Sequence, residues 1–63
     1  MFKKGQLIIV SYVNGSKKYC IFLEHDRNSI MYYDIKGKVI LKMHPYYTIT
    51  YNSKKELWQI TYG

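Results

Sequence analysis

The chain has 63 residues and a formal net charge of +6, and 48% of its residues are hydrophobic. A chain this short forms one domain with a small core, so we expect residues 1–63 to be a single domain. The single cysteine excludes an intramolecular disulfide, and the longest apolar run, residues 7–10, is too short to span a bilayer.

Short apolar runs alternate with polar turn segments along the whole chain, at a spacing of about ten residues that is typical of strands. No window carries apolar residues at helical spacing for three turns. The pattern predicts six strands, at residues 6–13, 18–24, 29–34, 39–43, 46–51 and 57–62. We therefore expect an all-β fold, either a small barrel or a rolled antiparallel sheet of five to six strands.

The first expected strand is apolar on both faces, which favours a central or well-covered position. Asn14-Gly15 follows it and fits a tight turn, because both residues tolerate a positive φ. In the fourth expected strand, the alternation places Ile40 and Lys42 on its outer side. Asp26 and Asp34 are interpreted as turn residues.

Part of this pattern is similar to a known family. Lys4-Gly5, the apolar run that follows, Asn14-Gly15 and the second apolar segment at residues 19–24 resemble the opening of an SH3-like small β-barrel of the KOW or Tudor type. The resemblance covers about the first 43 residues. It implies an SH3-like barrel, a fold whose members bind RNA, DNA or peptides, so it does not by itself choose a function.

The basic residues fall mainly in the expected turns. If the strands run up and down in sequence order, then the first, third and fifth turns lie at one end of the sheet. That end would carry six of the ten basic residues, namely Lys17, Lys18, Lys36, Lys38, Lys54 and Lys55. The functional hypothesis is a phosphate-binding end that contacts about 3–5 phosphates; the alternative is that lysines simply keep turns solvated.

The eight tyrosines are the second notable feature. Exposed rings beside the lysines would stack on bases, and the candidates are Tyr12, Tyr19, Tyr33 and Tyr51. The pairs Tyr32-Tyr33 and Tyr46-Tyr47 each place one ring on either side of a strand, so the outward rings would form an apolar patch or pack across strands.

The sequence offers no catalytic motif and no metal-binding pattern. Cys20, His25 and His44 do not have the spacing of a zinc site, and Cys20 lies among apolar residues, which indicates a buried thiol. There is no glycine-rich phosphate loop and no nucleophile motif. We therefore expect a protein that is not an enzyme and binds no metal or cofactor.

The leading hypothesis is a small basic module that binds nucleic acid with low sequence specificity. The alternative is a protein-interaction module that docks through exposed tyrosines on a host factor, a defence system or an assembly. A homo-oligomer is a third possibility. Abundant Ile, Lys and Tyr with no Ala indicate an AT-rich genome, such as that of a phage or mobile element. We expect a cytoplasmic location, because a lone thiol without a signal peptide suits a reducing compartment.

Overall fold

The chain folds into six β-strands, and the computed structural model describes residues 2–27, 29–43 and 46–62. The strands are β1 (Leu7–Tyr12), β2 (Lys17–His25), β3 (Ile30–Asp34), β4 (Val39–Met43), β5 (Tyr47–Asn52) and β6 (Leu57–Tyr62). Each begins and ends within one residue of its predicted position. The prediction of an all-β fold is confirmed.

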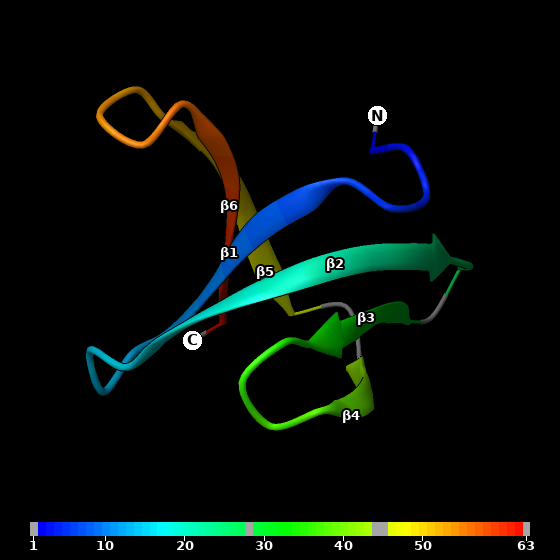
Figure 1. Ribbon diagram of the computed structural model, residues 1–63. Helices are drawn as coiled ribbons and strands as arrows, with labels where there is room; N and C mark the ends of the chain where they lie inside the picture. The colour runs from blue at the N-terminus through cyan, green and yellow to red at the C-terminus, as the bar shows by residue number, and fades with distance from the viewer. Residues whose placement is uncertain (1, 28, 44–45, 63) are drawn as a thin grey trace.

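All six strands belong to one sheet, in the order β4-β3-β2-β1-β6-β5 (Figure 1). Neighbouring strands are antiparallel except β1 and β6, which run parallel from the pair Ile9–Gln59 to the pair Tyr12–Tyr62. The expectation of strands that run up and down in sequence order is therefore wrong. After β4 the chain crosses to the far side of β1, because the apolar face of β6 completes the core beside that strand.

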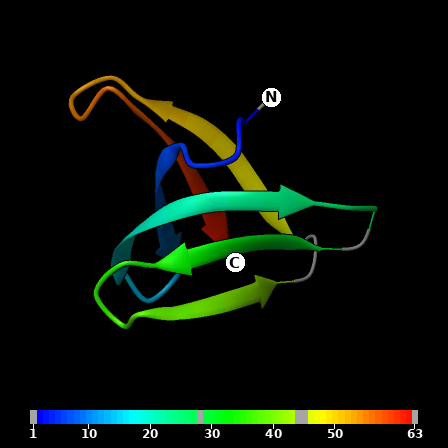
Figure 2. The ribbon, with the colours of Figure 1, turned by 45° about the vertical axis from the view of Figure 1, so that its right-hand side comes forward.

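The sheet is rolled but not closed. Figure 2 shows β2, β3 and β4 side by side, with β6 and β5 crossing behind them at a steep angle. The extents of the molecule, 27 × 24 × 22 Å, are nearly equal, whereas a flat sheet would be much thinner in one direction. A bulge in β2 between Phe22 and Glu24 adds local twist. Because β4 and β5 are edges that do not pair with each other, the rolled sheet, and not the closed barrel, is what forms.

The concave face of the rolled sheet holds the hydrophobic core. Its buried members are Ile8, Val10, Cys20, Phe22, Ile30, Tyr32, Ile60 and Tyr62. Burying each Ile or Val side chain of this set contributes about 1.5–3 kcal/mol. Phe2 closes one side of the core, with its ring 5.3 Å from that of Phe22 and 6.2 Å from that of Trp58. The predicted burial of Cys20 is confirmed.

The position of β1 explains why both of its faces are apolar. It is central in the sheet, and Ile9 on its convex face is only 3% exposed. Farther along the same face the packing is polar. The Ser11 and Thr61 hydroxyls share a hydrogen bond of 2.9 Å, and the Gln59 amide donates to the Ser11 hydroxyl over 3.0 Å. The prediction of a central, covered first strand is confirmed.

An Asn or Asp residue opens each of four turns. In each of these turns its side-chain oxygen accepts a backbone N–H two or three residues farther on, which fixes the turn locally. The pairs are Asn14 with Ser16, Asp26 with Ser29, Asp34 with Gly37 and Asn52 with Lys55. The interpretation of Asp26 and Asp34 as turn residues is confirmed.

Candidate nucleic-acid interface

The direction of the strands divides the six predicted lysines between two places. Both β1 and β3 are antiparallel to β2, so the turns after β1 and β3 lie at the same end of the sheet. The turn at residues 53–56 precedes β6, and β6 is parallel to β1, so this turn lies at the opposite end (Figure 1). Lys54 and Lys55 are therefore separated from the others, and the prediction that all six lysines lie at one end is wrong.

The remaining lysines surround an open groove. One wall is the start of β2, residues 17–19, and the other is the segment 34–37 at the end of β3 and in the following turn. The Ile35 N–H donates to the Tyr19 carbonyl over 3.3 Å, which holds the two walls together. Lys17, Lys18 and Lys36 line this groove, and Lys38 lies in the same turn. Below, "the basic groove" means this hollow and its lining residues.

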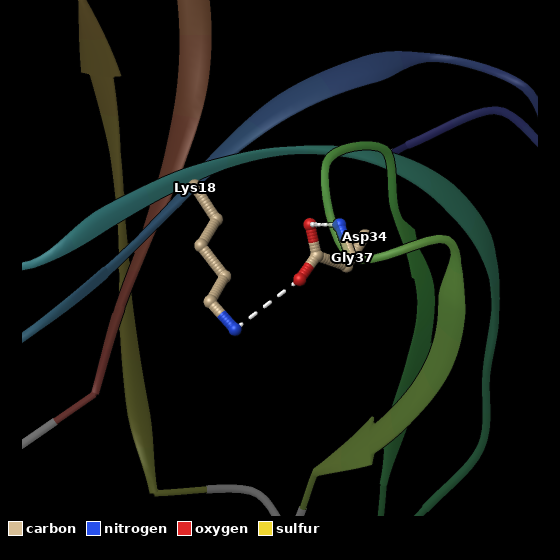
Figure 3. Close-up of polar contacts among 3 residues, drawn as sticks. All are labelled: Lys18, Asp34 and Gly37. Carbon is tan, nitrogen blue, oxygen red and sulfur yellow. Dashed lines mark hydrogen bonds and ion pairs between the residues drawn. The ribbon is translucent and has the colours of Figure 1, made fainter.

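Asp34 is the anchor of the basic groove. Its side chain is buried, and its Oδ2 lies 3.2 Å from the Lys18 Nζ while its Oδ1 accepts the Gly37 N–H over 3.2 Å (Figure 3). The Gly37 N–H and the Lys18 ammonium hold the pKa of the Asp34 carboxyl below its usual value. The same contact raises the pKa of Lys18. Lys18 is therefore engaged with Asp34, and its charge is partly neutralised.

The other three lysines of this end differ from Lys18. Lys17, Lys36 and Lys38 form no salt bridge with any residue that the structure describes. Gly37 keeps the turn tight between them, because a Cβ at this position would lie 2.8 Å from the Asp34 Oδ2. The sequence motif Lys36-Gly37-Lys38 thus places two cations on either side of a glycine that packs against a buried carboxylate.

The four candidate tyrosines lie in different environments. Tyr19 is 45% exposed and lines the basic groove. Tyr12 is half-buried, with its ring stacked on Tyr62 at 5.9 Å. Tyr33 is half-buried on the convex face, and Tyr51 packs against Trp58 beside the distant turn. Only Tyr19 combines exposure with a position beside the four clustered lysines.

The two tyrosine pairs divide as their alternation predicted. Tyr32 is fully buried in the core, whereas Tyr33 lies on the convex face. Tyr47 packs edge-on against Tyr62 at 5.8 Å, and Tyr46 is 85% exposed. The outward rings do not form one shared patch, because Tyr33 belongs to β3 and Tyr46 precedes the edge strand β5 at the other side of the sheet.

Of the remaining sequence candidates, Cys20 and His25 do not line the basic groove. Burial raises the pKa of the Cys20 thiol to about 11, and the nearby Asp34 charge acts in the same direction. His25 is exposed, with its ring 6.3 Å from that of Phe22, and His44 lies outside the described residues. Among the described residues, no three His, Cys, Asp or Glu side chains are grouped as a metal site would require. No helix in the described part of the chain has the length and apolar character to cross a membrane.

Sequence reasoning missed two features of the sheet. It did not identify Asp34 as a buried partner of Lys18, because the contact joins residues from two strands and depends on their register. It also did not find the row of apolar side chains on the convex face, formed by Leu7, Ile21, Tyr33 and Ile40. The alternation in β4 placed Ile40 outward, but alternation does not reveal which strands lie beside it.

The chain matches no family model, no curated protein and no solved structure. The similarity to SH3-like barrels of the KOW or Tudor type therefore stays a prediction, and function must be argued from the geometry of the chain itself.

Proposed function

We propose that this protein binds single-stranded nucleic acid with low sequence specificity through the basic groove. The observation that carries the proposal is the meeting of an exposed ring, Tyr19, with lysines from two separate segments in one open hollow. Aromatic rings beside a cationic track are the usual elements of a sequence-tolerant single-strand site, because every base has a face that stacks.

The lysines have two different roles in this proposal. Lys17 and Lys36 in the groove and Lys38 beside it bind phosphates, since their ammonium groups form no salt bridge with a carboxylate in the described part of the chain. Lys18 positions the groove through Asp34 and contributes less charge to the ligand. Three phosphate contacts correspond to a log–log salt slope of about −2 for a single strand. Binding should therefore be weak and should fall steeply with salt.

Low sequence specificity follows from the donors that the groove lacks. Base-edge recognition depends mainly on Arg, Asn and Gln side chains with paired donors and acceptors. None of these residue types lines the basic groove. Ammonium groups that contact phosphates position a strand without identifying its bases.

The test is fluorescence anisotropy with a labelled 12-nucleotide oligo(dT) or oligo(rU) over a range of salt concentrations. The variant Lys17→Ser/Lys36→Ser should weaken binding and reduce the magnitude of the salt slope. The control Lys54→Ser/Lys55→Ser removes the same charge from the opposite end and should leave the slope nearly unchanged. Equal losses in both variants would mean that net charge, and not the groove, governs binding.

The stacking role of Tyr19 has its own comparison. Tyr19→Ala should weaken binding by about 1–3 kcal/mol, whereas Tyr19→Phe should bind almost as well as the unmodified chain. No loss in Tyr19→Ala would remove the base contact from the proposal. No oligonucleotide binding at low salt would overturn the proposal as a whole.

A further inference from the structure

Strand β4 is an edge of the sheet that has few of the features by which proteins prevent an edge from pairing with another strand. Among the described strands, β4 lies beside β3 alone, and Figure 2 shows nothing covering its other side. Edge strands are usually blunted by prolines, bulges or several charges. Here the sequence is VILKM, with one charged residue, a regular register with β3 and no bulge. The Val39 and Ile40 side chains are 48% and 62% exposed.

The hydrogen-bond alternation identifies which backbone groups of β4 face outward. The Ile35 N–H donates to the Tyr19 carbonyl, so the backbone groups of Tyr33, two residues before Ile35, also point toward β2. The backbone groups of Tyr32 and Asp34 then point toward β4 and meet Leu41 and Val39. The N–H and C=O groups of Ile40 and Lys42 are therefore those directed to the open edge.

The side chains at this edge belong to an apolar row that ends without a neighbour. Ile40 pairs with Tyr33, Tyr33 with Ile21 and Ile21 with Leu7, so these four side chains form one row across β4, β3, β2 and β1. Ile40 is the last and most exposed member of this row. A further strand on the β4 edge would extend the row and cover Ile40.

The charge around the edge indicates the chemistry of the occupant. Residues 35–43 contain Lys36, Lys38 and Lys42 and no acidic residue. Asp34, which precedes them, is buried and engaged with Lys18. Glu24 and Asp26 line one hollow with Lys42, so the positive charge of this edge is greatest at Lys36 and Lys38. A second copy of the chain would bring two equally basic edges together, which disfavours self-pairing.

We propose that the β4 edge accepts an extended acidic segment of a partner protein as a seventh strand of the sheet. The backbone groups of Ile40 and Lys42 bond to the added strand, an apolar side chain of that strand packs against Ile40, and its carboxylates approach Lys36, Lys38 and Lys42. This mode of recognition draws affinity from main-chain hydrogen bonds and specificity from alternate side chains. Its backbone contacts lie outside the basic groove, because Ile40 and Lys42 do not line that hollow, but it shares Lys36 and Lys38 with the proposed phosphate contacts.

The test uses three synthetic peptides with blocked ends. The probe is EVIVEVE, in which the Ile that packs on Ile40 and the Glu that reaches Lys42 share one face. KVIVKVK has the opposite charge, and EVPVEVE keeps the acidic charge but has a proline that opposes strand pairing. Only the first should bind, as measured by calorimetry at moderate salt. Equal binding of the proline peptide would overturn the proposal, since the attraction would then be charge alone. Equal binding of the basic peptide would overturn the assignment of an acidic occupant.

Two variants locate the contact. Ile40→Pro removes an outward N–H without touching the bonds to β3, and it should abolish binding, whereas Ile40→Ala keeps the N–H and should reduce binding only partly. Lys42→Glu should weaken binding about tenfold or more through like-charge repulsion. Undiminished binding by Ile40→Pro would overturn the proposal.

Amide hydrogen exchange on the unmodified chain tests the pairing of a strand with β4 even if Ile40→Pro does not fold. The EVIVEVE peptide should slow exchange of the Ile40 and Lys42 amides at least about tenfold and leave the Leu41 amide, which already faces β3, nearly unchanged. Protection elsewhere, with none in β4, would overturn the proposal. Slow exchange of the Ile40 and Lys42 amides without peptide, together with a dimer in sedimentation, would assign the edge to a second copy instead.

Discussion

The Lys18 ammonium lies 3.2 Å from the Asp34 carboxylate, across the concave face between β2 and the end of β3. Asp34 is 4% exposed and also accepts the Gly37 N–H. One carboxylate therefore joins the second strand to the turn that carries Lys36 and Lys38. This contact therefore joins the two walls of the basic groove, because Lys18 belongs to one wall and Asp34 to the other.

The low pKa of Asp34 makes stability depend on pH. A carboxyl whose pKa is lower in the folded chain stabilises the fold above its unfolded pKa, near 3.8, and this stabilisation is lost as the pH falls through the folded value. We expect the urea concentration at the unfolding midpoint to decrease as the pH is lowered from about 5 to about 4 and below. Asp34→Asn should lower the midpoint at pH 7 and flatten its pH dependence. Glu24→Gln at the exposed surface is the control, and an equal flattening in that variant would contradict the assignment.

The variants Gly37→Ala and Gly15→Ala should both be less stable than the unmodified chain, but for different reasons. Gly15 has a φ of +88° with no atom within 4 Å of the place that a Cβ would occupy, so Gly15→Ala should cost about 1 kcal/mol from backbone strain. Gly37→Ala instead forces its methyl group against the Asp34 carboxylate, 2.8 Å away, and should disturb the Lys18 contact. Urea unfolding measures both losses. Only Gly37→Ala should also weaken oligonucleotide binding; a similar binding loss in Gly15→Ala would contradict this distinction.

Lys38 occupies a backbone conformation that suits glycine better. Its φ is +56°, in the left-handed region, which costs a residue with a side chain about 1 kcal/mol. Lys38→Gly should therefore raise the free energy of unfolding by up to about 1 kcal/mol while weakening oligonucleotide binding. Lys36→Gly is the matched control, because Lys36 does not have a positive φ and should gain no stability. A stability gain in both variants would contradict the strain at Lys38.

The folded chain is expected to have a small free energy of unfolding. At about 0.05–0.15 kcal/mol per residue, a chain of this length has roughly 3–9 kcal/mol of stability. Ile60 is fully buried, and Ile60→Ala should cost about 2–5 kcal/mol, which leaves the chain largely or partly unfolded. Ile40→Ala at the exposed edge removes the same atoms and should change stability by less than about 0.5 kcal/mol. Circular dichroism during urea unfolding measures both, and similar losses would contradict the described core.

The Cys20 thiol should be nearly inert in the folded chain. Burial raises its pKa from 9.0 to about 11, which lowers the thiolate fraction at pH 8 about a hundredfold, and the surrounding core further restricts access. Iodoacetamide should modify the folded chain at least that much more slowly than the chain in urea, as mass spectrometry would show. Equal rates would mean that Cys20 is not buried.

The strands and turns were predictable because their signals are local. Alternating apolar residues define each strand and its faces, and an Asn or Asp at the start of four turns caps the backbone within three residues. The central position of β1 was also predictable, since a strand that is apolar on both faces must be covered on both. The candidate site was only partly predictable: its four lysines and Tyr19 were placed together at one end, but Lys54 and Lys55 were wrongly added to them.

The sequence alone determined that this chain forms six short strands, which faces of them are apolar, and that lysines occupy the turns. The tertiary structure decided that β6 lies parallel beside β1, and this single pairing moves Lys54 and Lys55 to the far end. It also decided that Asp34 meets Lys18 and that β4 remains a free edge. The physical reason is that side-chain alternation specifies the face on which a residue lies, whereas strand order depends on contacts between residues far apart in the chain.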